Sequence, residues 1–139
     1  MARYGDEQQR YPNTGVDANL EINPDRIFIT PDSPSLIDQV TVPQVTANQD
    51  NYPLPTREVV LFTTDASRNF TGFSGARPGL TVFANVGTQD GVIVNNSASS
   101  TTENRVLCHT AANITLNAGE SVIIFYDYAS SRWRTVGFI

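Results

Sequence analysis

The adjacent residues Cys108 and His109 are the pair in this sequence that could supply a nucleophile and its base. Such chemistry needs the thiolate and the imidazole within hydrogen-bond reach of each other. Neighbours in a strand point to opposite faces of the sheet, so these two side chains would need a bulge or turn to meet. The chain holds one cysteine and one histidine. We therefore predict a buried thiol beside a loop histidine, and a protein that is not an enzyme.

Metal and acid–base chemistry find little support in the residue types. One cysteine and one histidine are too few for a zinc or copper site within one protomer. A threefold axis could still gather three copies of His109, and that alternative stays open. The carboxylates lack the spacing of a calcium-binding loop. The two carboxylates of a glycosidase come together only in the folded protein, so their spacing in the sequence does not exclude such a pair. We predict no catalytic residue, no metal ligand and no cofactor.

The net negative charge of the chain lies in its first part. Residues 1–58 hold nine acids and four arginines, which gives −5, and residues 59–139 hold five of each. Without a basic stripe we expect no nucleic-acid partner. No apolar run approaches the ~20 residues that span a bilayer, and the first residues lack the pattern of a signal peptide. We expect no membrane partner and a protein that is made and used without crossing a membrane.

Residues 1–56 read as an extended, proline-rich and acidic arm. Prolines at positions 12, 24, 31, 34, 43, 53 and 55 interrupt any helix, and only 26–30 and 36–42 could form short strands. A segment with so little apolar content cannot build its own core. We therefore expect the arm to dock on a partner. The candidate docking residues are Tyr4, Arg10, Tyr11, Phe28 and Tyr52.

Residues 57–139 read as a β domain. Short β-rich runs separated by turn residues recur about every ten residues, at 58–63, 80–85, 91–94, 104–108, 113–116, 121–126 and 132–139. No window has a sustained helical period. The pattern predicts an all-β fold, a compact antiparallel β-sandwich or barrel of jelly-roll type, preceded by the extended arm.

The run 121–126 is apolar on both faces, which is unusual for a strand that has water on one side. One face should line the core, and the other should meet a second layer that another subunit could supply. A β domain of about 80 residues without a disulfide is marginal alone, and oligomerisation is a common remedy. The candidates for core or subunit interface are Val122, Ile123, Ile124, Phe125, Tyr126, Trp133 and Phe138.

An ordered series of short motifs runs through residues 62–139. The motifs are Thr71-Gly72, Asn85-Val86-Gly87, Asn104-Arg105, Leu116 to Ser121 with Gly119, Tyr126-Asp127 and Arg132-Trp133. Taken together, this stretch resembles a β module of tailed-phage virion proteins, found among tail fibres, head fibres and capsid decoration proteins. The resemblance does not cover residues 1–56.

The resemblance implies a non-enzymatic and usually trimeric protein on the surface of a phage particle, assembled in the host cytoplasm. The short chain and the arm favour a capsid decoration or cement protein that docks on major capsid protein subunits. We found no internal repeat of the kind that builds a fibre shaft. The alternatives are a tail or baseplate attachment protein that binds a receptor, and a module that binds a host surface glycan.

Overall fold

The structure is a computed structural model that describes residues 38–137. The boundary between compact units falls between Leu36 and Ile37, so residues 38–56 belong to the same unit as the β domain. The predicted extended arm is therefore described only from Asp38 onward. Five of the candidate residues lie outside the described part of the chain: Tyr4, Arg10, Tyr11, Phe28 and Phe138.

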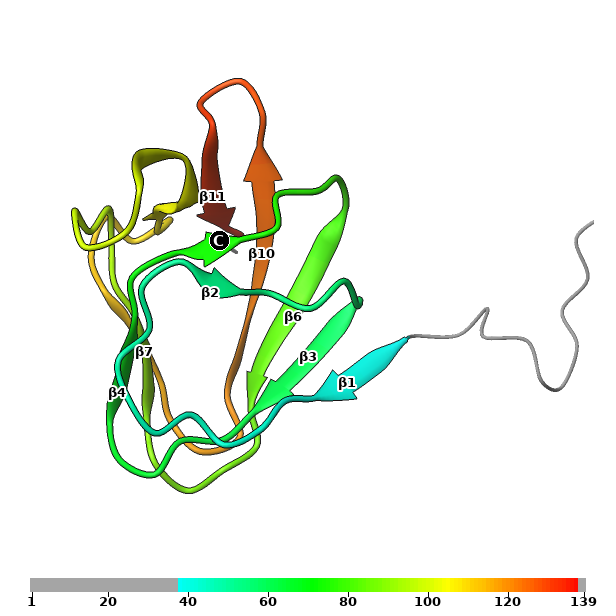
Figure 1. Ribbon diagram of the computed structural model, residues 1–139, viewed down its shortest axis with the longest axis vertical. Coiled ribbons are helices and arrows are strands. Elements are labelled where there is room, and N and C mark those ends of the chain that lie inside the picture. Colours follow the sequence, from blue (N-terminus) through cyan, green and yellow to red (C-terminus); the bar gives the residue numbers. More distant parts are fainter. Residues whose placement is uncertain (1–37, 138–139) are drawn as a thin grey trace, which may run out of the picture. The chain divides into compact units, whose positions relative to one another are not determined.

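The described residues form eleven strands and one short 3-10 turn, and they contain no α-helix, which confirms the all-β prediction (Figure 1). The strands are β1 (Gln39–Thr41), β2 (Tyr52–Pro53), β3 (Val59–Phe62), β4 (Arg68–Phe70), β5 (Phe73–Ser74), β6 (Leu80–Asn85), β7 (Gly91–Ile93), β8 (Val106–Leu107), β9 (Ile114–Leu116), β10 (Ser121–Asp127) and β11 (Arg132–Thr135). The 3-10 turn is Thr102–Asn104.

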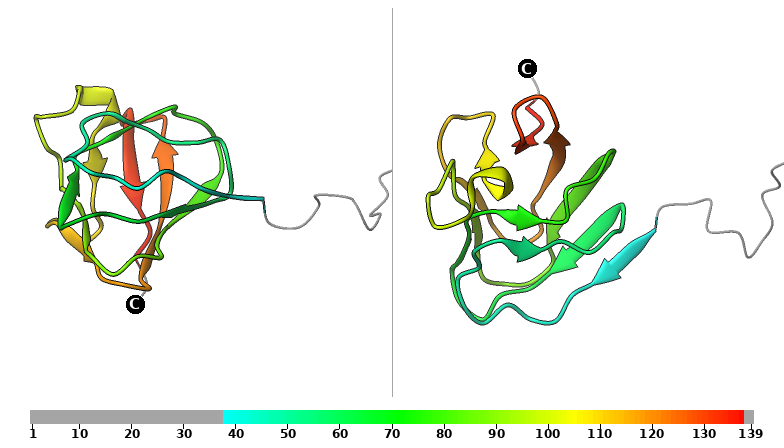
Figure 2. Two further views of the ribbon diagram at one scale, coloured as in Figure 1. Left: turned by 60° about the horizontal axis from the view of Figure 1, so that its bottom comes forward. Right: turned by 45° about the horizontal axis from the view of Figure 1, so that its top comes forward.

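The first half of the unit winds as stacked coils. β1 pairs in parallel with β3, and β3 pairs in parallel with β6, so Val40 lies beside Val60 and Val60 beside Phe83. The same stacking joins β4 to β7 and β2 to β5, again in parallel. The coil from β3 to β6 passes through all three sheets: β3 lies in the six-stranded sheet, β4 in the three-stranded sheet and β5 in the two-stranded sheet, before β6 returns beside β3 (Figure 2).

The second half reverses direction and closes the stack. β9 runs antiparallel to β7, and β10 runs antiparallel to β6. β11 then folds back on β10 as a hairpin, and β8 adds in parallel to β11. The result is a six-stranded sheet in the order β1-β3-β6-β10-β11-β8, which we call the long sheet.

The core lies inside the coils, where alternate residues of each strand point. Fully buried rings stack across neighbouring coils: Phe62 and Phe83 have ring centroids 4.4 Å apart, and Phe70 meets both edge-on. The Phe62 ring packs against Gly91 where a side chain would otherwise be. A Cβ on residue 91 would lie 2.6 Å from a carbon of that ring. Burial of these aromatic side chains is the main stabilising contribution of the interior.

One sequence expectation needs correction. The strands form coil-like, solenoid stacking rather than an antiparallel sandwich or jelly roll, because pairing between successive coils is parallel. The coils differ in length: Val40 pairs with Val60 twenty residues later, and Val60 pairs with Phe83 after a further 23. They share inward apolar positions rather than residue identities.

Candidate functional site

The motif residues behind the resemblance are used to hold the fold together. Asn85 is fully buried, and its Nδ2 donates to the backbone oxygens of Gln89 (2.7 Å) and Leu116 (2.8 Å). Its Oδ1 accepts from the backbone N–H of Gly87 at 3.0 Å. This asparagine closes the corner between β6 and β7, which lie in different sheets.

A second polar cluster fastens the loop after β7 to the first coil. Asn51 Oδ1 accepts hydrogen bonds from the backbone N–H of Thr101 and from Asn104 Nδ2, at 3.0 and 2.9 Å. Buried Ser100 lies 2.8 Å from Thr71 Oγ1. Gly72 is required at this crossing, because a Cβ would lie 2.4 Å from the backbone oxygen of Asn104. Asn51, Ser100 and the motif residues Thr71, Gly72 and Asn104 therefore support the architecture.

Cys108 and His109 have different surroundings and different hydrogen-bond partners. The Cys108 side chain is buried near the backbone oxygen of Ile93, and burial raises the pKa of this thiol to about 11. It therefore stays protonated near neutral pH. His109 is exposed, and its Nδ1 lies 2.7 Å from Thr135 Oγ1. No group of three or more metal-ligating side chains occurs among residues 38–137.

Among the carboxylates of residues 38–137, Asp127 at the end of β10 has the largest change in pKa. Asp127 Oδ2 accepts from Arg134 Nε at 2.7 Å and from Ser130 Oγ at 2.9 Å. These hydrogen bonds, with the Arg134 bond as the largest cause, lower the pKa of Asp127 to about 2. The network stays within one hairpin, so we read it as a structural lock for that hairpin.

This lock predicts an acid-dependent loss of stability. Because the pKa of Asp127 is lower in the folded protein than its ordinary 3.8, its contribution is complete above about pH 4 and disappears as the pH falls toward 2. We expect the melting temperature of wild type to drop more than that of Asp127→Asn across this interval, as followed by circular dichroism. Parallel curves for the two proteins would contradict the structural lock.

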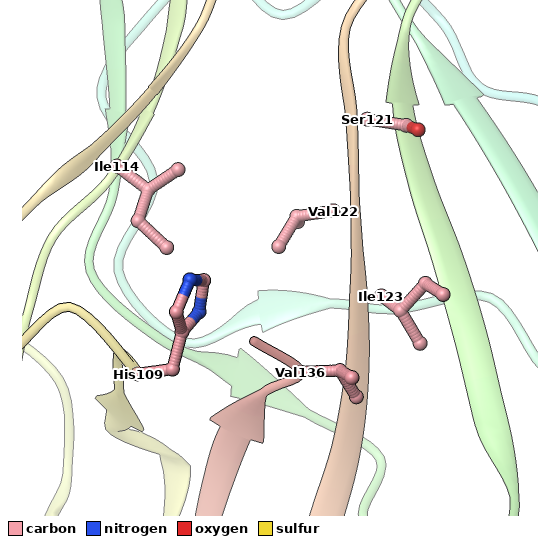
Figure 3. A pocket seen from close by; sticks show the side chains of 6 residues that line it. All are labelled: His109, Ile114, Ser121, Val122, Ile123 and Val136. Carbon is pink, nitrogen blue, oxygen red and sulfur yellow. The ribbon is translucent and has the colours of Figure 1, made fainter. Parts of the chain in front are cut away.

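A pocket lies at the seam where β9 and β10 separate, with a volume of about 400 Å³ (Figure 3). Its lining residues are His109, Ile114, Ser121, Val122, Ile123 and Val136. Figure 3 shows the Ile114 and Val122 side chains projecting into the space above the His109 ring. The walls are largely aliphatic, with one imidazole and one hydroxyl at the margin. Such a lining suits an apolar group better than a charged substrate.

The outer face of the long sheet carries apolar side chains on several neighbouring strands. Alternation along β3, β6 and β10 buries one set of side chains in the core and turns the other set outward. The outward residues form rows across the strands. The rows are Val59–Val82–Ile123–Val136, Leu80–Phe125–Arg134–Leu107 and Leu61–Ala84–Ser121. We call this surface the apolar face.

The side chains of the apolar face are partly open to solvent in the described chain. Leu80 is 59% exposed, and Val82, Ile123 and Phe125 are each half-buried. Exposed apolar surface that is contiguous across several strands commonly marks a contact with another molecule. The apolar face is therefore our candidate functional site.

The interface candidates from the sequence divide between the two sides of the long sheet. Val122, Ile124 and Trp133 are buried in the core, and Tyr126 is half-buried beside Trp133. Ile123 and Phe125 point outward on the apolar face, as the two-faced pattern indicated. Tyr52, a candidate docking residue, packs instead against Phe70 and other rings of its own core.

Sequence reasoning missed most of the apolar face. Val59, Leu61, Leu80, Val82 and Val136 join Ile123 and Phe125 only because β3 and β6 pair beside β10. A signal was present in residues 59–62, where four apolar residues follow one another. Such a run means that both faces of a strand are apolar, as in β10.

A scan against protein-family models and searches of curated proteins and of solved structures found no match to this chain. Within the described residues, no helix has the length and apolar character needed to cross a membrane. The geometry of the chain itself must therefore support any functional assignment.

Proposed function

We propose that this chain is a structural protein of a phage particle, a decoration or cement protein that attaches to the major capsid protein and stabilises or ornaments the head. The motif series at 71–133 supports the virion assignment by resemblance. The apolar face supports an assembly role, and it is the observation that carries the proposal. A protein that works by contact needs such a surface and needs no reactive group.

The polar chemistry of the described chain supports the same conclusion. The side chains of Asn85 and Asn51 make hydrogen bonds at corners of the fold. Asp127 makes hydrogen bonds within the last hairpin. Cys108 is a protonated, buried thiol near neutral pH. These side chains are thus occupied in holding the fold together.

Immunogold labelling of sedimented particles from the native source tests the proposal. We expect regular labelling over the head and release of the protein by conditions that strip decoration proteins but leave capsids intact. Labelling confined to the tail would favour the attachment protein instead. Absence of the protein from purified particles would overturn the virion assignment altogether.

One observation favours the glycan-binding alternative. Tyr128 is 59% exposed at the β10–β11 turn, and its ring centroid lies 5.0 Å from that of Tyr126 in an edge-on arrangement. Exposed aromatic rings can stack on sugar faces. Binding to a glycan array that is lost in Tyr128→Ala would support a receptor-binding role for this turn.

A further inference from the structure

We propose that Trp133, Tyr126 and Tyr128 carry an oxidising equivalent from the core to the surface, where it ends as a tyrosyl radical on Tyr128. We call these three side chains the aromatic path. This activity goes beyond the virion role and does not depend on it. It follows from which rings contact Trp133 and from how far each ring is open to water.

The aromatic path follows the last hairpin, which β10 and β11 form (Figure 1). Trp133 is 1% exposed, and its ring centroid lies 5.3 Å from that of Tyr126. The Tyr126 centroid lies 5.0 Å from that of Tyr128, whose side chain is 59% exposed. Rings at these spacings are in direct contact, and electrons pass readily between aromatic groups in contact. The path therefore joins a buried indole to a phenol in water.

The other ring contact of Trp133 offers no such exit. Among residues 38–137, the rings in contact with Trp133 are those of Phe73 and Tyr126. A phenyl ring is far harder to oxidise than an indole or a phenol, so Phe73 does not accept the charge. Tyr52 lies beyond Phe73, with its ring centroid 6.4 Å from that of Phe73. The electron that refills an oxidised Trp133 therefore comes from Tyr126.

The transfer begins when a one-electron oxidant in solution takes an electron from the Trp133 indole and is itself reduced. The indole keeps its Nε1 proton, because its hydrogen-bond acceptor is the backbone oxygen of Phe73 at 2.8 Å, a very weak base. An electron then passes from Tyr126 to Trp133. The Tyr126 hydroxyl donates to the backbone oxygen of Glu103 at 3.0 Å, which likewise does not remove its proton. Tyr128 returns an electron to Tyr126 and releases its phenolic proton to water, which leaves a neutral tyrosyl radical and a neutral Trp133.

Burial sets the direction of this transfer. A positive charge on Trp133 lies in the core without water to solvate it, which is costly. The radical on Tyr128 is neutral, and its proton has entered the solvent. Oxidation products of the indole would instead place oxygen atoms in a close-packed interior, beside Phe73. The aromatic path therefore moves oxidative damage away from a fully buried side chain of the core.

Flash photolysis of the full chain tests the proposal, with a cobalt(III) ammine complex in solution as the oxidant. The chain contains one tryptophan, so light at the long-wavelength edge of the indole absorption starts the reaction at Trp133. We expect the absorption of the indole radical to decay as that of a tyrosyl radical rises, at a rate independent of protein concentration. Absence of the tyrosyl signal, or a rate proportional to protein concentration, would refute the path.

Tyrosine-to-phenylalanine variants keep the rings and remove the oxidisable phenols. The double variant Tyr126→Phe, Tyr128→Phe should lose the conversion, and mass spectrometry should then find oxygen added to Trp133 more often than in wild type. Tyr52→Phe is the matched control, because Tyr52 is a half-buried tyrosine that Phe73 separates from Trp133. Circular dichroism should show that both variants are folded. Persistence of the conversion in the double variant, or its equal loss in Tyr52→Phe, would overturn the proposal.

A nitroso spin trap added before the flash identifies the residue on which the radical ends. Peptide mapping of the wild-type protein should find the trapped adduct on Tyr128. An adduct on Tyr52 or Trp133 in its place would show that the radical does not leave the core along the last hairpin.

Discussion

Trp133→Ala should be the most damaging single substitution in the described chain, with a loss of about 3–5 kcal/mol in the free energy of unfolding. Trp133 is 1% exposed and stands on β11 between the rings of Phe73 and Tyr126, with centroids 6.0 and 5.3 Å away. Its Nε1–H also donates to the backbone oxygen of Phe73 at 2.8 Å. Removal of the ring leaves a large cavity and an unsatisfied carbonyl. Urea unfolding followed by circular dichroism measures the loss.

Trp133→Phe separates the two contributions. It keeps an aromatic ring in the core but removes the hydrogen bond to Phe73, so the loss should be clearly smaller than that of Trp133→Ala. Equal, small losses for both variants would show that Trp133 does not hold β11 against the coils.

Asn85→Ala should cost about 2–4 kcal/mol, the second-largest expected effect. The substitution leaves the buried backbone oxygen of Leu116 and two groups of the β6–β7 corner without their partner. Thermal and urea unfolding of the purified variant measure this loss.

Asn117→Ala is the matched control for that experiment. Asn117 is exposed, and its side-chain amide bonds only to Glu120 in the turn before β10. We expect a change within about 0.5 kcal/mol, as for most surface substitutions. A similar loss for both alanine variants would contradict the special role of Asn85.

The all-β class was predictable because it depends on local signals. Turn residues between β-rich runs marked the strands. One such turn precedes β10, where Gly119 has a φ of 84°. The motifs Tyr126-Asp127 and Arg132-Trp133 lie on the two strands of the last hairpin, and its register pairs Tyr126 with Trp133.

The parallel stacking was not predictable from the same signals. β1 pairs with β3 after a full coil of the chain. The coil between them contains Pro43, Pro53 and Pro55, which suggested an extended segment outside the domain. Proline-rich sequence suits the coil corners just as well, because it disfavours helix without preventing short strands. Val40, Val42 and Val45 point inward and pack in or against the core. Their apolar character is visible in the sequence, but the length of the coil that brings them to the core is not.

The candidate site was half predictable for a related reason. The two-faced pattern of β10 indicated a second layer, and Ile123 and Phe125 do lie on the apolar face. The partners of these residues come from β3 and β6, whose placement beside β10 is a long-range feature of the fold. A single sequence contains no local signal for such pairing.

Hydroxyl-radical footprinting of the native full chain tests the central claim, that the apolar face is a protein contact, most directly. Labelling of Leu80 and Phe125 is compared between the purified protein and the protein on purified particles, with exposed Tyr128 at the hairpin turn as the internal reference. The proposed contact predicts that Leu80 and Phe125 lose labelling on the particles, while Tyr128 does not. Equal labelling of Leu80 and Phe125 in the two samples would contradict the claim.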